Sequence, residues 1–278
     1  MNYFLDQVSR FFLTLEQISF SDLFLAFLSI MPWGLALFFF QPGKSSRKLK
    51  IVLFALLMGF ISTRLILYFH PIIWPEVDFK PRKTSMLTAT AHLAFIQAGM
   101  MEETFKILMI LVLAYFFGYE KRKSIWTKDV ILIGAFVALG FAFTENYTYI
   151  HKEAMNKFQM FTGRFLYSSN IHLLINLCFA LFLLKSNTEV QPQDRFSYLL
   201  KAFFLAVMQH GVVDFFLIPS SKFGIWLSVA LFMGIWVWVV RDLRRLVYFD
   251  EYIVHIEKKL DFLEERPAIS NPIGIAEN

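Results

Sequence analysis

The sequence predicts an all-α fold, a polytopic membrane helix bundle with about seven transmembrane helices. Hydrophobic residues make up 57% of the chain and phenylalanine alone occurs 34 times, far more than soluble domains carry. The apolar residues lie in long runs, each near the roughly 20 residues that a helix needs to cross a bilayer. Strands of a membrane barrel would be shorter and would alternate apolar with polar residues. We therefore expect one helical membrane domain.

The predicted elements follow one another in three parts. Residues 1–19 mix charged residues with Phe and Leu, so we expect an N-terminal interfacial segment and no cleaved signal peptide. The membrane domain, residues 20–240, is expected to contain spanning segments at residues 20–40, 51–70, 90–117, 129–150, 166–184, 199–218 and 223–240. Apolar residues recur among the many charges of residues 241–278, which predicts a cytoplasmic amphipathic tail helix that ends at Pro267.

Basic residues in the connecting loops predict the orientation. They gather at residues 44–50, 121–128 and 241–245, and such clusters face the cytoplasm. This places the N-terminus outside and the C-terminus in the cytoplasm, although residues 80–83 add basic charge on the opposite side. The same short loops account for the net charge of +5, so we expect membrane lipids and no nucleic acid as partners.

Four of the apolar segments carry ionisable or amide side chains, which are costly at membrane depth and mark a functional site by default. These residues are Glu102, Glu103, Lys106, Glu145, Asn146, His172, His210 and Asp214. At a rise of 1.5 Å per residue, the alternating helix directions place all of them between the midplane and the outer face. We therefore expect the four helices to form one site.

The paired glutamates favour acid–base chemistry. Glu102 and Lys106 stand one helical turn apart and can form an ion pair on one face, whereas Glu103 is expected to point about 100° away. Lys106 would then hold one carboxylate while the other accepts a proton from water. The alternative is an ion pair that only fixes the helix interface.

The histidines raise the possibility of a metal. His210 and Asp214 are one turn apart, so Asp214 can orient the imidazole or both can ligate one ion. The chain has no His-Glu-x-x-His motif, so a divalent metal such as zinc would need ligands from separate helices: His172, His210, Asp214 and Glu145. Carboxylate ligands also suit harder ions. Without a metal, the histidines would act alone and no other cofactor is expected.

The order of the polar motifs is specific. It reads Glu102-Glu103-x-x-Lys106, Phe141-x-x-x-Glu145-Asn146, His172 and His210-Gly-x-x-Asp214-Phe215. This order resembles the PrsW family of intramembrane proteases, which is distantly similar to the CAAX prenyl proteases. The resemblance covers about residues 90–217, and the chain departs from the family pattern after His172, where it carries Asn176 and Ala180.

The resemblance implies a membrane-bound endopeptidase with Glu102, Glu103, His172 and His210 in catalysis. It further implies a bacterial cell-membrane enzyme that cuts membrane-anchored proteins in regulated intramembrane proteolysis, with site-1 cleavage of an anti-sigma factor on the outer side as its model. A base glutamate would activate water, and a histidine or a metal held by it would stabilise the oxyanion.

Two other classes compete with this interpretation. Intramembrane Glu, Asp, His and Lys also build proton relays in ion- or proton-coupled transporters, although the sequence shows neither an inverted repeat nor a pair of broken helices. A non-enzymatic receptor or scaffold could use the same charges to fix helix register.

Overall fold

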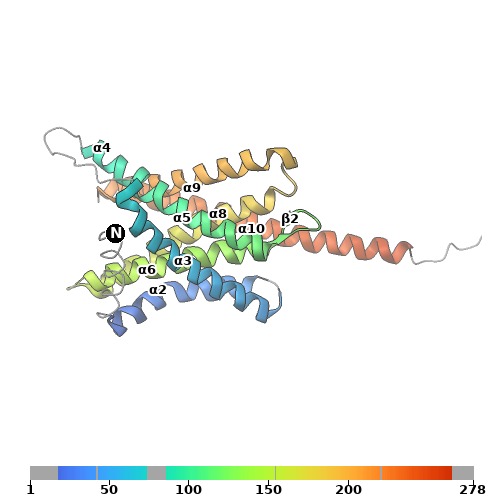
Figure 1. The fold of residues 1–278 in the computed structure, drawn as a ribbon, viewed down its shortest axis with the longest axis horizontal. Helices are drawn as coiled ribbons and strands as arrows, with labels where there is room; N and C mark the ends of the chain where they lie inside the picture. The colour runs from blue at the N-terminus through green and yellow to red at the C-terminus, as the bar shows by residue number, and fades with distance from the viewer. Residues whose placement is uncertain (1–17, 42, 74–85, 154, 220, 265–278) are drawn as a thin grey trace, which may run out of the picture. The chain divides into compact units, whose positions relative to one another are not determined.

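The computed structural model describes residues 18–41, 43–73, 86–153, 155–219 and 221–264, and these residues form a helical bundle (Figure 1). Its α-helices are α2 (Phe20–Phe40), α3 (Ser45–Ile73), α4 (Met86–Ala91), α5 (Met101–Leu113), α6 (Asp129–Lys152), α7 (Lys157–Gly163), α8 (Ser169–Lys185), α9 (Arg195–Leu217) and α10 (Lys222–Glu264). Shorter elements are the π-helical η1 (His92–Met100), η2 (Ala114–Gly118) and η3 (Arg164–Ser168), the 3-10 turn η4 (Pro192–Asp194) and the antiparallel strands β1 (Tyr119–Glu120) and β2 (Ile125–Trp126).

The predicted polytopic helical fold is confirmed. Within the described residues, 6 helices are long and apolar enough to cross a membrane: Phe20–Phe40, Ser45–His70, Asp129–Lys152, Lys157–Lys185, Pro192–Leu217 and Lys222–Leu246. The remaining expected segment, residues 90–117, lies in a helical run from Met86 to Gly118 that changes between α and π hydrogen bonding. That run is as long as a span, but it carries Glu102, Glu103 and Lys106 in its middle, which makes it less apolar than the other six helices.

Two of these π-helical stretches lie directly before residues of the expected site. η1 ends at Met100, so Glu102 and Glu103 begin the α-helix that follows it, and η3 ends four residues before His172. Single π-turns in α-helices are frequent at functional sites, because the extra residue re-aims the side chains that follow. The backbone therefore changes register where the polar groups enter the bundle.

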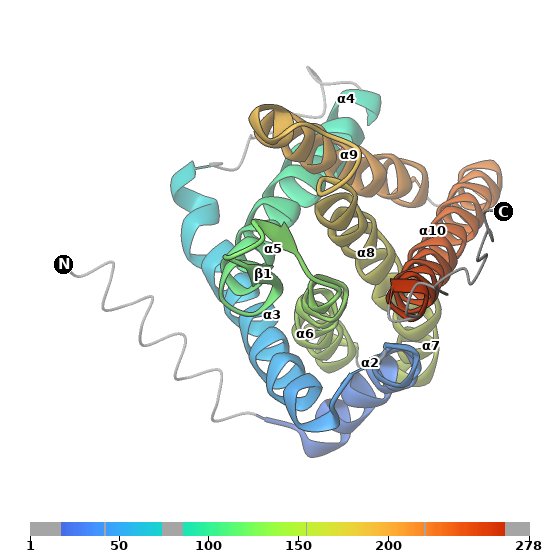
Figure 2. The ribbon, with the colours of Figure 1, turned by 90° about the vertical axis from the view of Figure 1, so that its right-hand side faces the viewer.

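Helix α6 forms the centre of the bundle, with α2, α3, α5 and α8 packed around it (Figure 2). Its residues from Val130 to Ala142 are all buried, as expected for a helix that is apolar on every face. In the apolar stretch of α6, 83% of the residues are buried, compared with 22% in α2 and 28% in α3. The outer two helices therefore turn most of their surface to lipid, and α6 and α8 supply the core.

Glycines allow α3 and α6 to cross at backbone contact. A Cβ atom at Gly140 would lie 2.8 Å from the Cα atom of Leu56, and one at Gly59 would lie 2.6 Å from the backbone nitrogen of Phe141. Small residues at such crossings let membrane helices approach closely. This crossing brings the following turns of α6, which carry Glu145 and Asn146, toward the centre.

The C-terminal helix continues past residue 240, the expected end of the membrane domain. α10 runs from Lys222 to Glu264 without a break at residue 240, and the chain divides into two compact units, Met1–Trp236 and Val237–Asn278. Residues 1–17 and Pro267 lie outside the described residues, as do the basic residues 80–83. The three-part division of the chain stays a prediction.

Candidate active site

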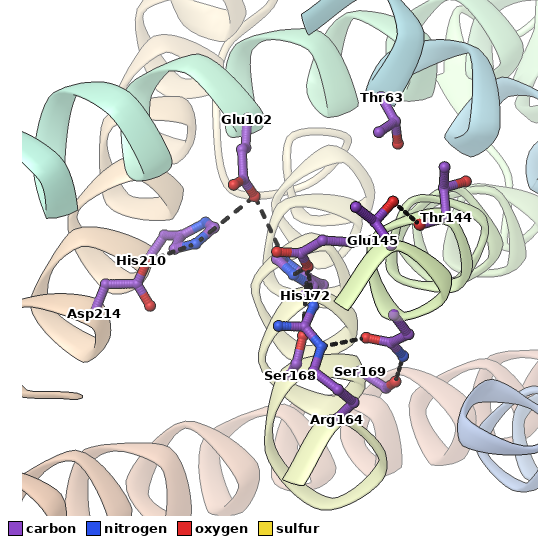
Figure 3. Close-up of polar contacts among 12 residues, drawn as sticks. Thr63, Glu102, Thr144, Glu145, Arg164, Ser168, Ser169, His172, His210 and Asp214 are labelled. Atoms are coloured by element: carbon purple, nitrogen blue, oxygen red, sulfur yellow. Dashed lines mark hydrogen bonds and ion pairs between the residues drawn. The ribbon is translucent and has the colours of Figure 1, made fainter. Parts of the chain in front are cut away.

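The expected polar residues of four helices meet around Glu102. Its carboxylate points at two imidazole rings (Figure 3), with Oε2 3.8 Å from Nε2 of His210 and 4.0 Å from Nδ1 of His172. The two rings lie with their centroids 5.3 Å apart. α5, α8 and α9 each contribute one of these residues, so the predicted convergence of the helices is present.

Lys106 and Glu103 form the buried base of the site. Both side chains are inaccessible to solvent, and Nζ of Lys106 lies 2.6 Å from Oε1 of Glu103 and 3.5 Å from Oε2 of Glu102. The expectation that Glu103 points away from Lys106 is therefore wrong. Positions three and four residues apart share one helix face, and the long lysine side chain reaches both, with Phe141 beneath its ammonium group at 4.3 Å.

Each histidine is oriented by a carboxylate. Nδ1 of His210 lies 2.7 Å from Oε1 of Glu103, and Nε2 of His172 lies 2.8 Å from Oε2 of Glu145. A carboxylate on one ring nitrogen holds the imidazole in place and sets which nitrogen carries the proton. Asp214 lies on the other side of His210, with Oδ2 3.4 Å from Nε2.

Sequence reasoning missed Arg164, which holds Glu145 in turn. Its Nη2 forms an ion pair with Oε2 of Glu145, its Nε donates to Oδ1 of Asn146 at 2.6 Å, and its guanidinium lies 4.4 Å from the ring centre of Tyr149. The expected fifth segment begins at residue 166, which leaves Arg164 outside the predicted spans. Its position two residues before an apolar run was the available signal.

Two of the buried asparagines tie helices together. Asn146 donates to the hydroxyls of Ser29 at 2.6 Å and Ser169 at 2.9 Å, which joins α6 to α2 and α8. Asn176, one turn after His172, donates to Oε2 of Glu103 at 3.4 Å. The position at which the sequence departs from the family pattern therefore contacts the same glutamate that orients His210.

A divalent metal fits the centre of this arrangement. Glu102, His172 and His210 each offer one ligand atom within 4.8 Å of the others, and two imidazoles with one carboxylate form a ligand set of zinc hydrolases. Oε2 of Glu102 is buried and accepts no hydrogen bond from any described residue. The predicted ligands His172 and His210 belong to this group. Glu145 contacts the far nitrogen of His172, whereas Asp214 shares Nε2 of His210 with Glu102.

Lys106 competes with a metal for one of these ligands. Its Nζ lies 3.0 Å from Nδ1 of His172, whose other ring nitrogen contacts Glu145. Both nitrogens of His172 thus have partners, and a metal would have to replace one of them. His210 also has partners on both ring nitrogens, Glu103 on Nδ1 and Asp214 on Nε2, so a metal at Nε2 would have to displace the contact with Asp214.

Solvent reaches the site from the side of three carboxylates. The side chains of Glu102, Glu145 and Asp214 are 18%, 20% and 27% exposed, whereas Glu103 and Lys106 are fully buried. Water can therefore approach Glu102 but not Glu103. The site combines an accessible carboxylate, two oriented imidazoles and a buried cation, which are the parts needed for hydrolysis of an acyl bond.

A family of known proteins matches most of the helical bundle. The family described as PrsW family intramembrane metalloprotease matches residues 47–240, a range that contains all eight predicted polar residues. No solved structure matches the chain.

Curated relatives carry the same family name. Protease PrsW of Clostridioides difficile (strain 630) is 29% identical over 147 residues, 52% of this chain and 60% of that protein. Protease PrsW of Halalkalibacterium halodurans is 30% identical over 146 residues, 52% of this chain and 63% of that protein. The chain thus matches less than two thirds of the length of these two relatives. Protease PrsW of Geobacillus kaustophilus is 24% identical over 211 residues, 76% of this chain and 86% of that protein.

Proposed function

The chain belongs to the PrsW family of intramembrane metalloproteases, and from this membership we propose that it is an endopeptidase that hydrolyses membrane-anchored protein substrates. One observation carries the proposal: Glu102, His172 and His210, from three helices, present their ligand atoms to one another within 4.8 Å. A non-enzymatic scaffold would need only ion pairs that hold the helices together. It would not need a partly exposed carboxylate that faces two imidazoles.

The segment of the substrate that contains the scissile peptide bond must be unwound from its helix to enter the site. We propose that the substrate chain approaches from the side on which Glu102, Glu145 and Asp214 are exposed. The positive-inside rule assigns this level to the outer half of the membrane. The proposed cut is therefore extracytoplasmic, as in site-1 cleavage of an anti-sigma factor, in a bacterial inner membrane with the N-terminus outside.

Glu103 holds the site together and does not handle the proton of the attacking water. Its Oε1 contacts both Lys106 at 2.6 Å and His210 at 2.7 Å, and its side chain is fully buried. We therefore assign it the positioning of His210 and the partial neutralisation of Lys106. Of the paired glutamates, Glu102 alone combines access to water with an oxygen that accepts no hydrogen bond in the described part of the chain.

A bound metal would be held by Glu102, His172 and His210, where it would polarise the scissile carbonyl and make bound water more acidic. Glu145 and Glu103 would keep the two rings oriented from behind. Glu102 can act in one of two ways. It can be a ligand of the metal, or it can be the general base that accepts the proton of the water and returns it to the leaving amine. Metal analysis of the Glu102→Gln protein separates them, because loss of metal indicates a ligand and retained metal without activity indicates a base.

The test is cleavage of a membrane-anchored reporter by the full chain in a cell membrane. Glu102→Gln and His210→Ala are expected to abolish cleavage while insertion and expression persist. Glu120→Gln, which changes an exposed glutamate in the hairpin between α5 and α6, is the matched control and keeps wild-type cleavage. Undiminished cleavage by both site variants would overturn the proposal.

A further inference from the structure

Helix α2 carries a stripe of polar side chains, although it contributes no residue to the centre around Glu102. Asp22 and Ser29 are fully buried and Trp33 is half-buried. They follow one another at spacings of seven and four residues, which places them on one side of the helix. α2 packs against α6, α7 and η3 (Figure 2), and it lies before residues 47–240, the range that matches the PrsW family.

Trp33 holds the backbone of the π-helical turn η3. Its Nε1 donates to the carbonyl oxygen of Phe165 at 3.2 Å, and the two rings pack with their centroids 5.5 Å apart. The same carbonyl oxygen accepts from Nδ2 of Asn170 at 3.3 Å. A π turn displaces backbone carbonyls from the α-helical hydrogen-bond pattern. The two side-chain donors therefore stabilise the turn at the residue that follows Arg164.

Ser29 holds the side-chain partner of Arg164. Nδ2 of Asn146 donates to Oγ of Ser29 at 2.6 Å, and Oδ1 of the same amide accepts from Nε of Arg164 at 2.6 Å. The Ser29 hydroxyl donates to the carbonyl oxygen of Ala26, so it faces Asn146 as an acceptor. Because an arginine only donates, the amide must turn its oxygen to Arg164, and Ser29 favours that orientation.

These contacts matter because little packing fixes the segment that carries Arg164. None of the residues of α7 or η3 is buried. Asp22 fastens the start of α7 through Lys157, with Oδ1 and Nζ 2.6 Å apart, and Trp33 fastens η3 eight residues later. The guanidinium of Arg164 then lies against Glu145 (Figure 3).

We propose that Ser29 and Trp33 are positioning residues of the centre. Together they hold Arg164 on Glu145, and Glu145 in turn orients His172. Ser29 acts through the side-chain partner of the arginine, and Trp33 acts through the backbone beside it. The effect on cleavage rests on the proposed protease function, whereas the hold on Arg164 is a property of the fold and is measured without activity.

The first test measures the accessibility of Arg164. Purified full-length protein in detergent is treated with phenylglyoxal, which modifies arginine side chains, and the modification of Arg164 is followed by mass spectrometry. Ser29→Ala and Trp33→Phe are each expected to speed it up about five-fold, the factor that corresponds to one ordinary hydrogen bond. The controls Ser62→Ala and Trp226→Phe remove a buried hydroxyl that donates within its own helix and an exposed indole, and they should keep the wild-type rate. Wild-type labelling in both α2 variants would overturn the proposal.

The second test measures cleavage of a fluorogenic transmembrane peptide by the same preparations. Each α2 variant is expected to lower kcat about five-fold with KM unchanged, and to cause no further loss when combined with Arg164→Gln. A separate, additive loss in that background would overturn the positioning role, because the residues would then act independently of Arg164. Absence of cleavage by the wild type would overturn the proposed function and the catalytic consequence with it, whereas faster labelling would still show that α2 holds Arg164.

Discussion

Replacing Arg164 by Gln tests whether the site depends on a residue that never faces its centre. The change removes the ion pair with Glu145, the 2.6 Å hydrogen bond to Asn146 and the contact with Tyr149. Breaking a fully buried ion pair costs about 3–5 kcal/mol. The side chains of Arg164 and Glu145 are 15% and 20% exposed, so solvent weakens this ion pair. We therefore expect the free energy of unfolding to fall by about 2–3 kcal/mol, which is close to the contribution of a hydrogen bond to a charged group.

The effect on activity follows from the chain of contacts to His172. Without Arg164, Glu145 keeps His172 at 2.8 Å and Ser168 at 3.5 Å as its hydrogen-bond partners, and the orientation of the imidazole loosens. Removal of such an outer partner costs about 10- to 100-fold in activity or metal affinity. We expect the loss in kcat with little change in KM, because Arg164 acts through Glu145 and not on the substrate.

The assay is cleavage of a fluorogenic transmembrane peptide by purified protein in defined lipid, with folding followed by thermal unfolding. Arg164→Lys is expected to recover part of kcat, because it keeps the charge but not the forked geometry. The double variant Arg164→Gln/Glu145→Gln should be no slower than Glu145→Gln alone. Arg122→Gln, at an exposed arginine in the turn between β1 and β2, is the control. Additive losses in the double variant, or wild-type kcat in Arg164→Gln, would refute the reasoning.

Three further predictions concern the metal, the buried cation and the helix crossing. Purified wild-type protein is expected to contain a divalent ion by elemental analysis, to lose cleavage on chelation and to regain it with Zn²⁺; full activity after complete metal removal would contradict the metal site. Lys106→Met leaves two carboxylates without their cation, so we expect a stability loss of about 3–5 kcal/mol, measured by thermal unfolding against Lys123→Met; an unchanged midpoint would show that the pair is not needed. Gly140→Leu, which drives a side chain into the backbone of Leu56, should prevent accumulation of folded protein on size-exclusion chromatography, and a normal elution profile would rule out this crossing.

The positions of the helices followed from hydropathy because a bilayer leaves the backbone little choice. Within the described residues, five of the seven expected segments agree with a spanning helix to within about ten residues at each end, and Lys222–Leu246 begins where the seventh was expected. The run from Met86 to Gly118 was expected as uniform α-helix. Its π-helical stretches were not predicted; η1 packs against α9 and η2 against α6.

The candidate site was predicted as a set of residues but not as a set of contacts. Helix direction and rise per residue were enough to place Glu102, His172 and His210 at one level. Which glutamate binds Lys106 depends on how far the lysine side chain reaches across one helix face. Helical periodicity predicted the pair with Glu102, whereas the shorter contact is with Glu103. Arg164 was missed because its partner, Glu145, is on another helix. Its place just before an apolar run indicates a helix end, but not which residue it contacts.

The sequence by itself determined the helical class, the spans and the polar residues that converge, because the cost of charge and unpaired backbone in lipid is imposed residue by residue along the chain. The tertiary structure alone decided which carboxylate stays accessible and which nitrogens face it. Those features depend on distances between side chains of different helices, and such distances are set by how the helices pack around α6.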